Sequence, residues 1–472
     1  MFRLKLRIRR LFKTLFWVWP LFNLLSIFVP LHAQVPPKKV YMTMEEAIER
    51  ALSQNNQVRA SEFAVKRASW DRKNAWMQLL PDLSLNSRMT RIDNETFAQR
   101  DFRRYMPPEI AKQIPQTVFQ LSYYTSFDVT VPLFDSALLN GLFITRANEN
   151  MAQQLKESTR QNIIFQVISS YLNVLQGKEI FRLQEDYLEL SKRNYEKAER
   201  LYKAGRYSKT EALRWKVEYQ QQKSVVVENA SILRSHMTHL NRLLNRSMHE
   251  LIEIEGQIPQ RLLSESETLT ALSDVDILNL IPKDDESLIR ANSALSAARS
   301  GEETSKYLYR NSYVSYLPNV SASYSYGWRE NNTLALDDYS PTMFMVNLSV
   351  PIFTSFRNFT NLKSSYYEYK QSQEEFQDQL KNTRYVLTEI VNQIINLKTQ
   401  KELSKTNTEY SEHNYRVVAQ QKEKGLVSNI DFIDAKLNLQ NAKLDEVNTH
   451  YDFITAMVEL YYVLGKIDSI IE

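Results

Sequence analysis

Two short stretches of the chain repeat one arrangement of glycine, serine and acid. The residues are Gly205, Ser208 and Glu211 in the first stretch, and Gly425, Ser428 and Asp431 in the second. Glycine readily adopts the left-handed conformation that ends many helices. A serine with an acidic residue three positions later is a capping box, which begins a helix. Each stretch is therefore predicted to form the tight tip of a helical hairpin.

A second acid follows the later tip. Asp434 comes three residues after Asp431, so the two carboxylates lie on nearly one face of the predicted helix. A capping residue at position 431 would look the same in sequence as a functional acid, and both interpretations stay open. Asp434 has no capping role, which makes it the better candidate for a functional carboxylate.

Enzymatic chemistry has little support in this sequence. His236 and His239 are three residues apart on a predicted helix and could share a metal ion. No nearby carboxylate completes that set, and two surface histidines would give the same pattern. The chain contains no cysteine, which excludes disulfides, thiolate metal sites and thiol catalysis. Without a nucleophile motif or a phosphate-binding loop, we predict no catalytic residue, no metal site and no cofactor.

The charge of the chain is concentrated at its N-terminus. The formal net charge is +4, but six basic residues and no acid lie within residues 1–33, so the remainder carries +4 − 6 = −2. The mature chain therefore has no basic excess for nucleic-acid binding, and we predict no nucleic-acid partner.

The N-terminal basic residues precede an apolar run from Leu15 to Val29 and the small residue Ala33. This layout predicts a secretory signal peptide over residues 1–33. An uncleaved anchor helix is the alternative, which Pro20 and Pro30 disfavour because they interrupt the run. No later segment approaches the roughly 20 apolar residues of a membrane helix. An exported protein is therefore predicted.

Four segments alternate apolar and polar residues with the period of a β-strand, near residues 83–89, 123–133, 320–328 and 344–352. The first pair is separated by a polar, proline-containing loop near 93–122, too long for a tight turn and predicted to be an exposed insertion. Each strand is close in length to a tilted membrane-spanning strand, which has roughly 9 to 11 residues.

The rest of the chain has helical periodicity. Helices are predicted over about 44–80, 137–203, 209–244, 285–316, from the fourth strand to 424, and 429–464. The helix over 137–203 would be on the order of 100 Å long, and its near-heptad stripe predicts coiled-coil packing.

The order of these segments occurs twice. Each half reads helix, strand, strand, very long helix, tip and helix. We predict a first repeat over 34–245, a connector without clean periodicity over 246–284, and a second repeat over 285–472.

The strands decide between a soluble and a membrane protein. Their apolar faces need a covering layer in water but none in lipid, where an open four-stranded sheet would leave backbone groups unsatisfied at its edges. Closure with two further copies would give 4 × 3 = 12 strands around a polar lumen. A soluble sandwich edge or a pair of surface hairpins is the alternative.

Together these features resemble the TolC-like outer-membrane efflux channel family. The resemblance covers nearly the whole mature chain. It rests on the start at 42–48, both tips, the Leu-Pro-Asp/Asn beginnings of two strands at 80 and 317, and the Val-Pro-Leu/Ile-Phe ends of two strands at 131 and 350. It implies a homotrimer with a 12-stranded β-barrel in outer-membrane lipid and a helical α-barrel that extends into the periplasm. A periplasmic adaptor (membrane fusion) protein and an inner-membrane pump would be the partners.

The resemblance also assigns roles to residues at the tips. The family carries two aspartates six and nine residues after the second tip glycine, which line the periplasmic entrance; here they are Asp431 and Asp434. Six carboxylates in a trimer would attract cations and raise one another's pKa by like-charge repulsion. The family's adaptor-docking positions correspond to Gly205, Arg206, Gly425 and Leu426.

Glu211 matches an acid that ties neighbouring helices shut in the family. Its usual tyrosine and arginine partners are Lys422 and Val427 here, so an ion pair between Lys422 and Glu211 is the expected substitute. We therefore predict a passive export duct of a tripartite efflux or secretion system. The rival prediction is a periplasmic coiled-coil scaffold or adaptor without a pore.

Overall fold

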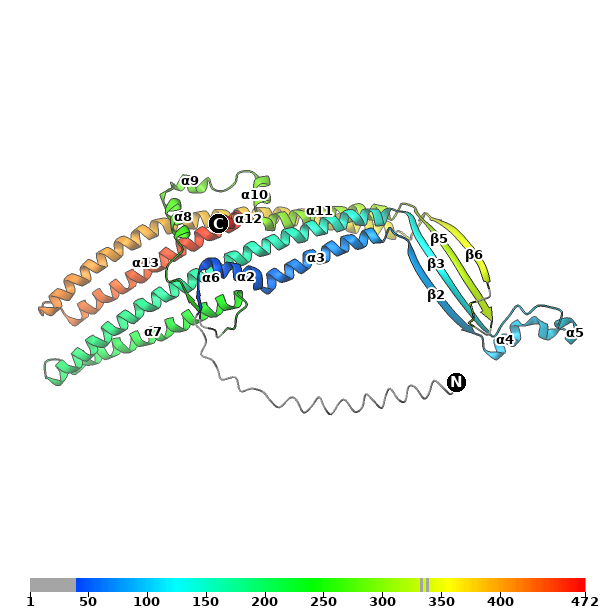
Figure 1. Cartoon of the computed structure of the whole chain (residues 1–472). Helices are drawn as coiled ribbons and strands as arrows, with labels where there is room; N and C mark the ends of the chain where they lie inside the picture. Colours follow the sequence, from blue (N-terminus) through cyan, green and yellow to red (C-terminus); the bar gives the residue numbers. More distant parts are fainter. Residues whose placement is uncertain (1–39, 249, 251, 332–333, 337–338, 472) are drawn as a thin grey trace, which may run out of the picture.

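The computed structural model describes residues 40–471 except 249, 251, 332–333 and 337–338. The predicted signal peptide, residues 1–33, lies outside the described residues. The chain forms an elongated and mostly helical body (Figure 1). A four-stranded antiparallel sheet lies at one end of this body and two helical hairpins lie at the other.

The strands follow one another in the order β2-β3-β5-β6. Their bounds are β2 Asp82–Arg91, β3 Leu121–Asp135, β5 Asn319–Asn331 and β6 Tyr339–Ser349. The register aligns Leu83, Val129, Tyr324 and Phe344 directly across the four strands. Because successive side chains point to opposite faces, one face is apolar and the other carries mostly serine, asparagine and threonine. The four predicted strands are confirmed.

The fourth strand ends earlier than predicted. It stops at Ser349 rather than reaching Ile352. Pro351 has no N–H for the ladder, and Ser355 and Phe356 adopt left-handed backbone angles before the next helix. Pro132 is tolerated inside β3 because it lies where the register shifts by a bulge.

The segment between β2 and β3 is more regular than a plain loop. It contains the short helices α4 (Asn94–Arg100), η1 (Phe102–Tyr105) and α5 (Pro108–Ala111). They project beyond the end of the sheet that is remote from the long helices (Figure 1).

Four helices lead away from the sheet in the same order as the strands. They are α3 (Asn56–Met77), α6 (Ser136–Lys203), α11 (Ser293–Val314) and α12 (Arg357–Glu423). Each packs on the next, α3 on α6, α6 on α11 and α11 on α12. The predicted long helices are confirmed, since α6 has 68 residues and α12 has 67. From the tips, α7 (Lys209–Leu243) returns against α6 and α13 (Asn429–Val463) against α12.

Two helices that the sequence predicts as continuous are broken. The predicted helix over 44–80 divides at Asn55 into α2 (Met44–Gln54) and α3, and that over 285–316 divides at Asn292 into α10 (Asp285–Ala291) and α11. Each asparagine caps the second helix through its side-chain oxygen. Each asparagine also donates a hydrogen bond from its Nδ2 to the last residue of a returning helix. Asn55 donates to the carbonyl of Leu243 and Asn292 to the carbonyl of Val463, both at 2.9 Å. Both breaks therefore serve tertiary contacts.

The predicted connector, 246–284, contains regular structure. It holds β4 (Ile252–Ile254), which pairs in parallel with β1 (Val40–Met42), followed by α8 (Gln260–Ala271) and α9 (Asp274–Leu278). These elements lie against the middle of the body, where the apolar core also lies (Figure 1).

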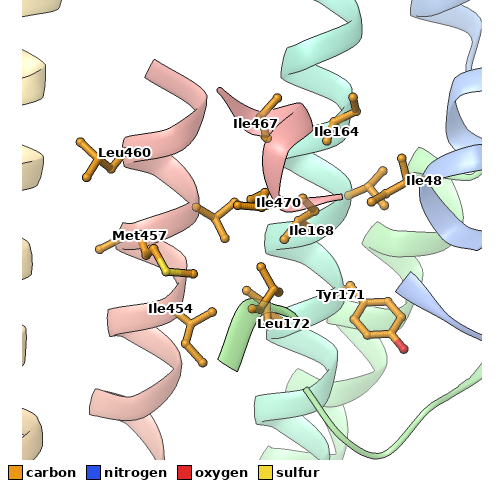
Figure 2. Packing of buried hydrophobic residues seen from close by; sticks show 14 of the residues in the cluster. Ile48, Ile164, Ile168, Tyr171, Leu172, Ile454, Met457, Leu460, Ile467 and Ile470 are labelled. Carbon is orange, nitrogen blue, oxygen red and sulfur yellow. The ribbon is translucent and has the colours of Figure 1, made fainter. Parts of the chain in front are cut away.

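Figure 2 shows this core, in which residues of α2, α6, α13 and the last turn η2 (Ile467–Ile470) meet. Tyr171, Leu172, Ile454 and Met457 are each at most 1% exposed. Tyr171 also donates its hydroxyl to the carbonyl of Met42 at 3.2 Å. Among the described residues, no helix combines the length and apolar character that a membrane span needs.

Candidate functional site at the helical tips

The two tips have the same backbone turn. Gly205 and Gly425 both have φ of +72°, a left-handed angle that glycine accepts without strain. In the second tip Gly425 N–H donates to the Lys422 carbonyl at 3.1 Å, and Leu426 N–H donates to the Gln421 carbonyl at 2.9 Å. The first tip repeats these bonds, and the pattern is a Schellman motif. The predicted hairpin tips are confirmed.

Both predicted capping boxes are present. In the second, Asp431 N–H donates to Ser428 Oγ at 3.2 Å, and Ser428 N–H donates to Asp431 Oδ2 at 3.0 Å. Ser208 and Glu211 make the same pair of bonds at the start of α7. Hydrogen bonds from Ser428 hold the pKa of Asp431 below its usual value, with a smaller contribution from Lys422. The cap is thus formed while this carboxylate is ionised, and it weakens as pH falls through that lowered pKa.

The structure places Asp431 and Asp434 on the solvent-exposed side of α13. The opposite side of the same helix is buried, with Lys436 0% exposed and Ala435 4% exposed. Among the described residues, neither aspartate forms an ion pair within 4.0 Å. The capping role of Asp431 therefore leaves one of its oxygens, and the whole Asp434 carboxylate, open to solvent in the single chain.

The predicted docking residues form the outermost part of the tips. Gly205, Arg206, Gly425 and Leu426 are all exposed, and Leu426 exposes 71% of its surface. A Cβ added at either glycine would meet no atom within 4 Å.

Glu211 and Lys422 are linked through a third residue, which the sequence pattern does not single out. Asn429 lies between them and is 7% exposed. Its Nδ2 donates to Glu211 Oε1 at 2.9 Å, and its Oδ1 accepts from the Lys422 ammonium. Burial lowers the pKa of Lys422, an effect that the nearby Glu211 charge opposes. The arrangement joins α12, α13 and α7 at the tips in place of the direct ion pair that the sequence suggested.

Two buried polar layers continue this link away from the tips. In the first, the Lys436 ammonium of α13 donates to Glu218 of α7 and, at 2.6 Å, to Ser191 of α6. In the second, Gln440 Nε2 donates to Gln184 Oε1 at 2.8 Å, and Gln222 Nε2 donates to the same oxygen at 2.7 Å. The layers therefore fix α13 against α6 and α7.

The sequence offers a weak signal for these layers. Positions 429, 436 and 440 of α13 are seven and four apart, as are positions 211, 218 and 222 of α7. Such spacing places each set on one helix face. Three polar residues on one face of a helix usually indicate solvent, so the pattern alone does not reveal burial.

Small and aromatic side chains fill the space between the tip link and the first polar layer. Trp215 and Phe432 lie with ring centroids 6.2 Å apart, and Tyr415 lies 5.6 Å from Phe432. Ala198 of α6 completes this buried cluster. Its rings come from α7, α12 and α13, so both hairpins contribute to it.

His236 and His239 lie on α7, and burial lowers the pKa of both. His236 packs beside Gly177 of α6, where an added Cβ would lie 3.4 Å from its ring. In the described part of the chain, no group of three or more His, Asp or Glu side chains gathers as a metal site would require.

A sequence model described as "outer membrane efflux protein" matches residues 47–246 and 286–466. The chain belongs to the outer membrane efflux protein family. No curated protein sequence matches this family member.

Solved structures of outer-membrane proteins share the fold of this efflux protein. VceC of Vibrio cholerae has a TM-score of 0.73 at 15% identity, over 89% of this chain and 96% of its own. The CmeC channel of Campylobacter jejuni has a TM-score of 0.73 at 13% identity, and the match covers 90% of this chain and 86% of CmeC. The open MtrE channel of Neisseria gonorrhoeae has a TM-score of 0.72 at 14% identity, and the match covers 90% of this chain and 89% of MtrE. The family model thus makes this chain an outer-membrane efflux protein, its fold is that of solved outer-membrane channels, and the pore-free scaffold is disfavoured.

Proposed function

We propose that three copies of this chain form a passive duct through the outer membrane and periplasm. The observation that carries the proposal is the sheet, which has two open edges and one apolar face. Leu83, Leu85, Phe344 and Leu348 on that face are 60–69% exposed in the single chain. Such a surface is stable in lipid only when both edges are paired, and β2 and β6 are the edges. Three copies close a barrel of 12 strands around the polar face.

The helices support the same closure. Phe63, Trp70 and Met77 of α3 are spaced by seven residues, and each is more than half exposed. They lie on the side opposite the buried Ala68 and Ala75. An apolar stripe at the free lateral edge of the helical layer suits contact with α12 of a neighbouring copy, which would close the α-barrel.

We further propose that the chain arose from two repeats, 34–245 and 285–472, joined by the connector 246–284. Three pairs of features support this division. The helix breaks at Asn55 and Asn292 have corresponding hydrogen bonds, both tips have the same turn, and α7 and α13 both contain 35 residues.

The tips suit an encounter with other proteins. Gly205, Arg206, Gly425 and Leu426 form the exposed end of both hairpins and would be the docking surface for a periplasmic adaptor. An inner-membrane pump would then drive transport. The link between Glu211, Asn429 and Lys422 would act as the latch that holds the hairpins together until docking.

The pore entrance would carry the paired acids. Three copies of Asp431 and Asp434 would direct six carboxylates at a narrow axis and favour cations there. The exposed side of α13 supports this role, because both aspartates are exposed among the described residues and are available to an axis formed by three copies.

Conductance of the purified mature trimer in a planar bilayer tests the duct. Small, long-lived and cation-preferring openings are expected. Hexaamminecobalt(III), a trivalent cation, should block wild type from the tip side. The variant with Asp431→Ala and Asp434→Ala should need about tenfold more of it for half block, because the trimer then lacks the six carboxylates that attract the trivalent cation.

A matched control removes a different acid near the tips. Glu199 pairs with Lys203 at 3.3 Å on α6, and Glu199→Ala should leave the block unchanged. Unchanged block in the aspartate variant would exclude those residues from the entrance. A folded wild-type protein that never conducts, and that stays soluble without detergent, would support the scaffold instead.

A further inference from the structure

The polar face of the sheet changes its charge along the strands. Near the end remote from the long helices, Arg88 of β2 lies directly opposite Tyr124 of β3, and Tyr124 lies directly opposite Arg329 of β5. Asp128 lies on the same face, four residues along β3 toward the helices. This face therefore runs from an acid in its middle to two arginines near its outer end.

Asp128 has several hydrogen-bond partners, whereas the two arginines have no acidic partner among the described residues. Asp128 accepts hydrogen bonds from Ser126 at 2.7 Å, Asn86 at 2.8 Å and Ser325 at 2.5 Å. Both arginines are exposed, and within the described residues neither guanidinium has a carboxylate within 4.0 Å. Among the described residues, this face thus holds its acid in hydrogen bonds and leaves its two arginines without an acidic partner.

Tyr124, which lies between the two arginines, occupies space that the absence of a side chain at Gly327 leaves open. A Cβ added to Gly327 of β5 would lie 3.3 Å from the Tyr124 hydroxyl and 3.2 Å from the Thr125 carbonyl. Gly327 lies two residues before Arg329 on β5, and the two residues therefore share one face of the sheet. The missing side chain lets the Tyr124 ring lie across β5, beside Arg329.

The spacing of the arginines makes them repel one another. Neighbouring strands are about 4.8 Å apart, so two strands place the backbones of Arg88 and Arg329 about 10 Å apart. Like charges at that separation disfavour folding unless a mobile or bound anion screens them. A water-filled lumen would supply such anions.

We propose that Arg88, Tyr124 and Arg329 form a cationic belt at the outer end of the duct, which attracts anionic solutes to that end. This inference rests on the trimeric duct proposed above. Two arginines per chain in three chains would give six positive charges around the lumen, opposite in sign to the aspartates at the tips. A passage with fixed charge of opposite sign at its two ends passes ionic current more readily in one direction. The open duct is therefore expected to rectify.

Block by citrate, a trivalent anion at neutral pH, tests the belt. Wild-type trimers in a planar bilayer should be blocked by citrate added on the sheet side. The double variant Arg88→Gln with Arg329→Gln should need at least about tenfold more citrate for half block and should rectify less. The charge-conserving variant Arg88→Lys with Arg329→Lys should behave like wild type in both respects.

Arg91 provides a matched control, because it lies three residues from Arg88 on β2 and points to the opposite face of the sheet. Arg91→Gln should leave citrate block unchanged, whereas Arg88→Gln alone should weaken it. Trimer bands on non-denaturing gels would establish that every variant assembles. Equal block in wild type and the double variant, or equal effects of Arg91→Gln and Arg88→Gln, would overturn the belt while leaving the duct intact. Assembled wild-type trimers without conductance would overturn the duct itself.

Discussion

Two glycines with nearly the same backbone angle have different surroundings. Gly425 at the second tip has φ of +72°, and Gly465 after α13 has φ of +69°. A Cβ at Gly425 would meet nothing within 4 Å, whereas one at Gly465 would lie 1.9 Å from the Ala291 carbonyl oxygen. Gly465 therefore allows the end of α13 to pack against the break at Asn292, and Gly425 only allows the chain to reverse.

These surroundings predict different costs for the same substitution. Gly425→Ala should lower the free energy of unfolding by about 1 to 2 kcal/mol, the cost of left-handed backbone for a residue with a Cβ. Gly465→Ala should cost more, because the added carbon requires Ala291 or α13 to move. Thermal unfolding of the two purified variants in detergent measures the difference. Equal melting temperatures would show that the close approach at Ala291 has no energetic weight.

At the scale of elements, the contact of α13 with α6 and α7 depends on a buried ion pair. Lys436 is 0% exposed at its side chain and Glu218 is 12% exposed. Lys436→Met should destabilise this contact by about 3 kcal/mol, because the Glu218 carboxylate then stays buried without its counter-charge. Hydrogen exchange of α6 near Ser191 should accelerate accordingly.

A second variant separates charge burial from loss of packing. Lys436→Met combined with Glu218→Leu should recover most of the protection, since neither charge then remains buried. A double variant as labile as Lys436→Met alone would indicate that the ammonium stabilises the helices through Ser191 rather than through Glu218.

The strands, long helices and tips were predictable because local pattern determines them. The alternation around Val129 and Tyr324 has period two, and the stripe in α6 has helical period. Asn55 and Asn292 were missed because a single asparagine does not interrupt a helical pattern, and only the contacts with Leu243 and Val463 give each break its purpose. Asn429 between Lys422 and Glu211 was missed for a similar reason, since three helices must meet before it can bridge them.

For the whole molecule, the lateral edges of the chain would form the contacts of the proposed trimer. Trp70 is 66% exposed on the free side of α3, midway along the stripe with Phe63 and Met77. Trp70→Glu should weaken the proposed trimer, because a carboxylate would then be desolvated in an apolar contact. Gel mobility and light scattering in mild detergent measure the trimer fraction. Trp70→Phe keeps an aromatic ring and should assemble normally; if Trp70→Glu assembles equally well, the stripe is not part of the contact between copies.

The two hairpins are closely matched in length. Helices α6 and α12 differ by a single residue, 68 against 67, and α7 and α13 both have 35. At about 1.5 Å per residue, the two tips of one chain end within a few ångström of the same depth, and Figure 1 shows both at the same end of the body. Six tips arranged in this way would present a level rim. A partner approaching along the axis would then meet every tip at once, without a stagger to accommodate.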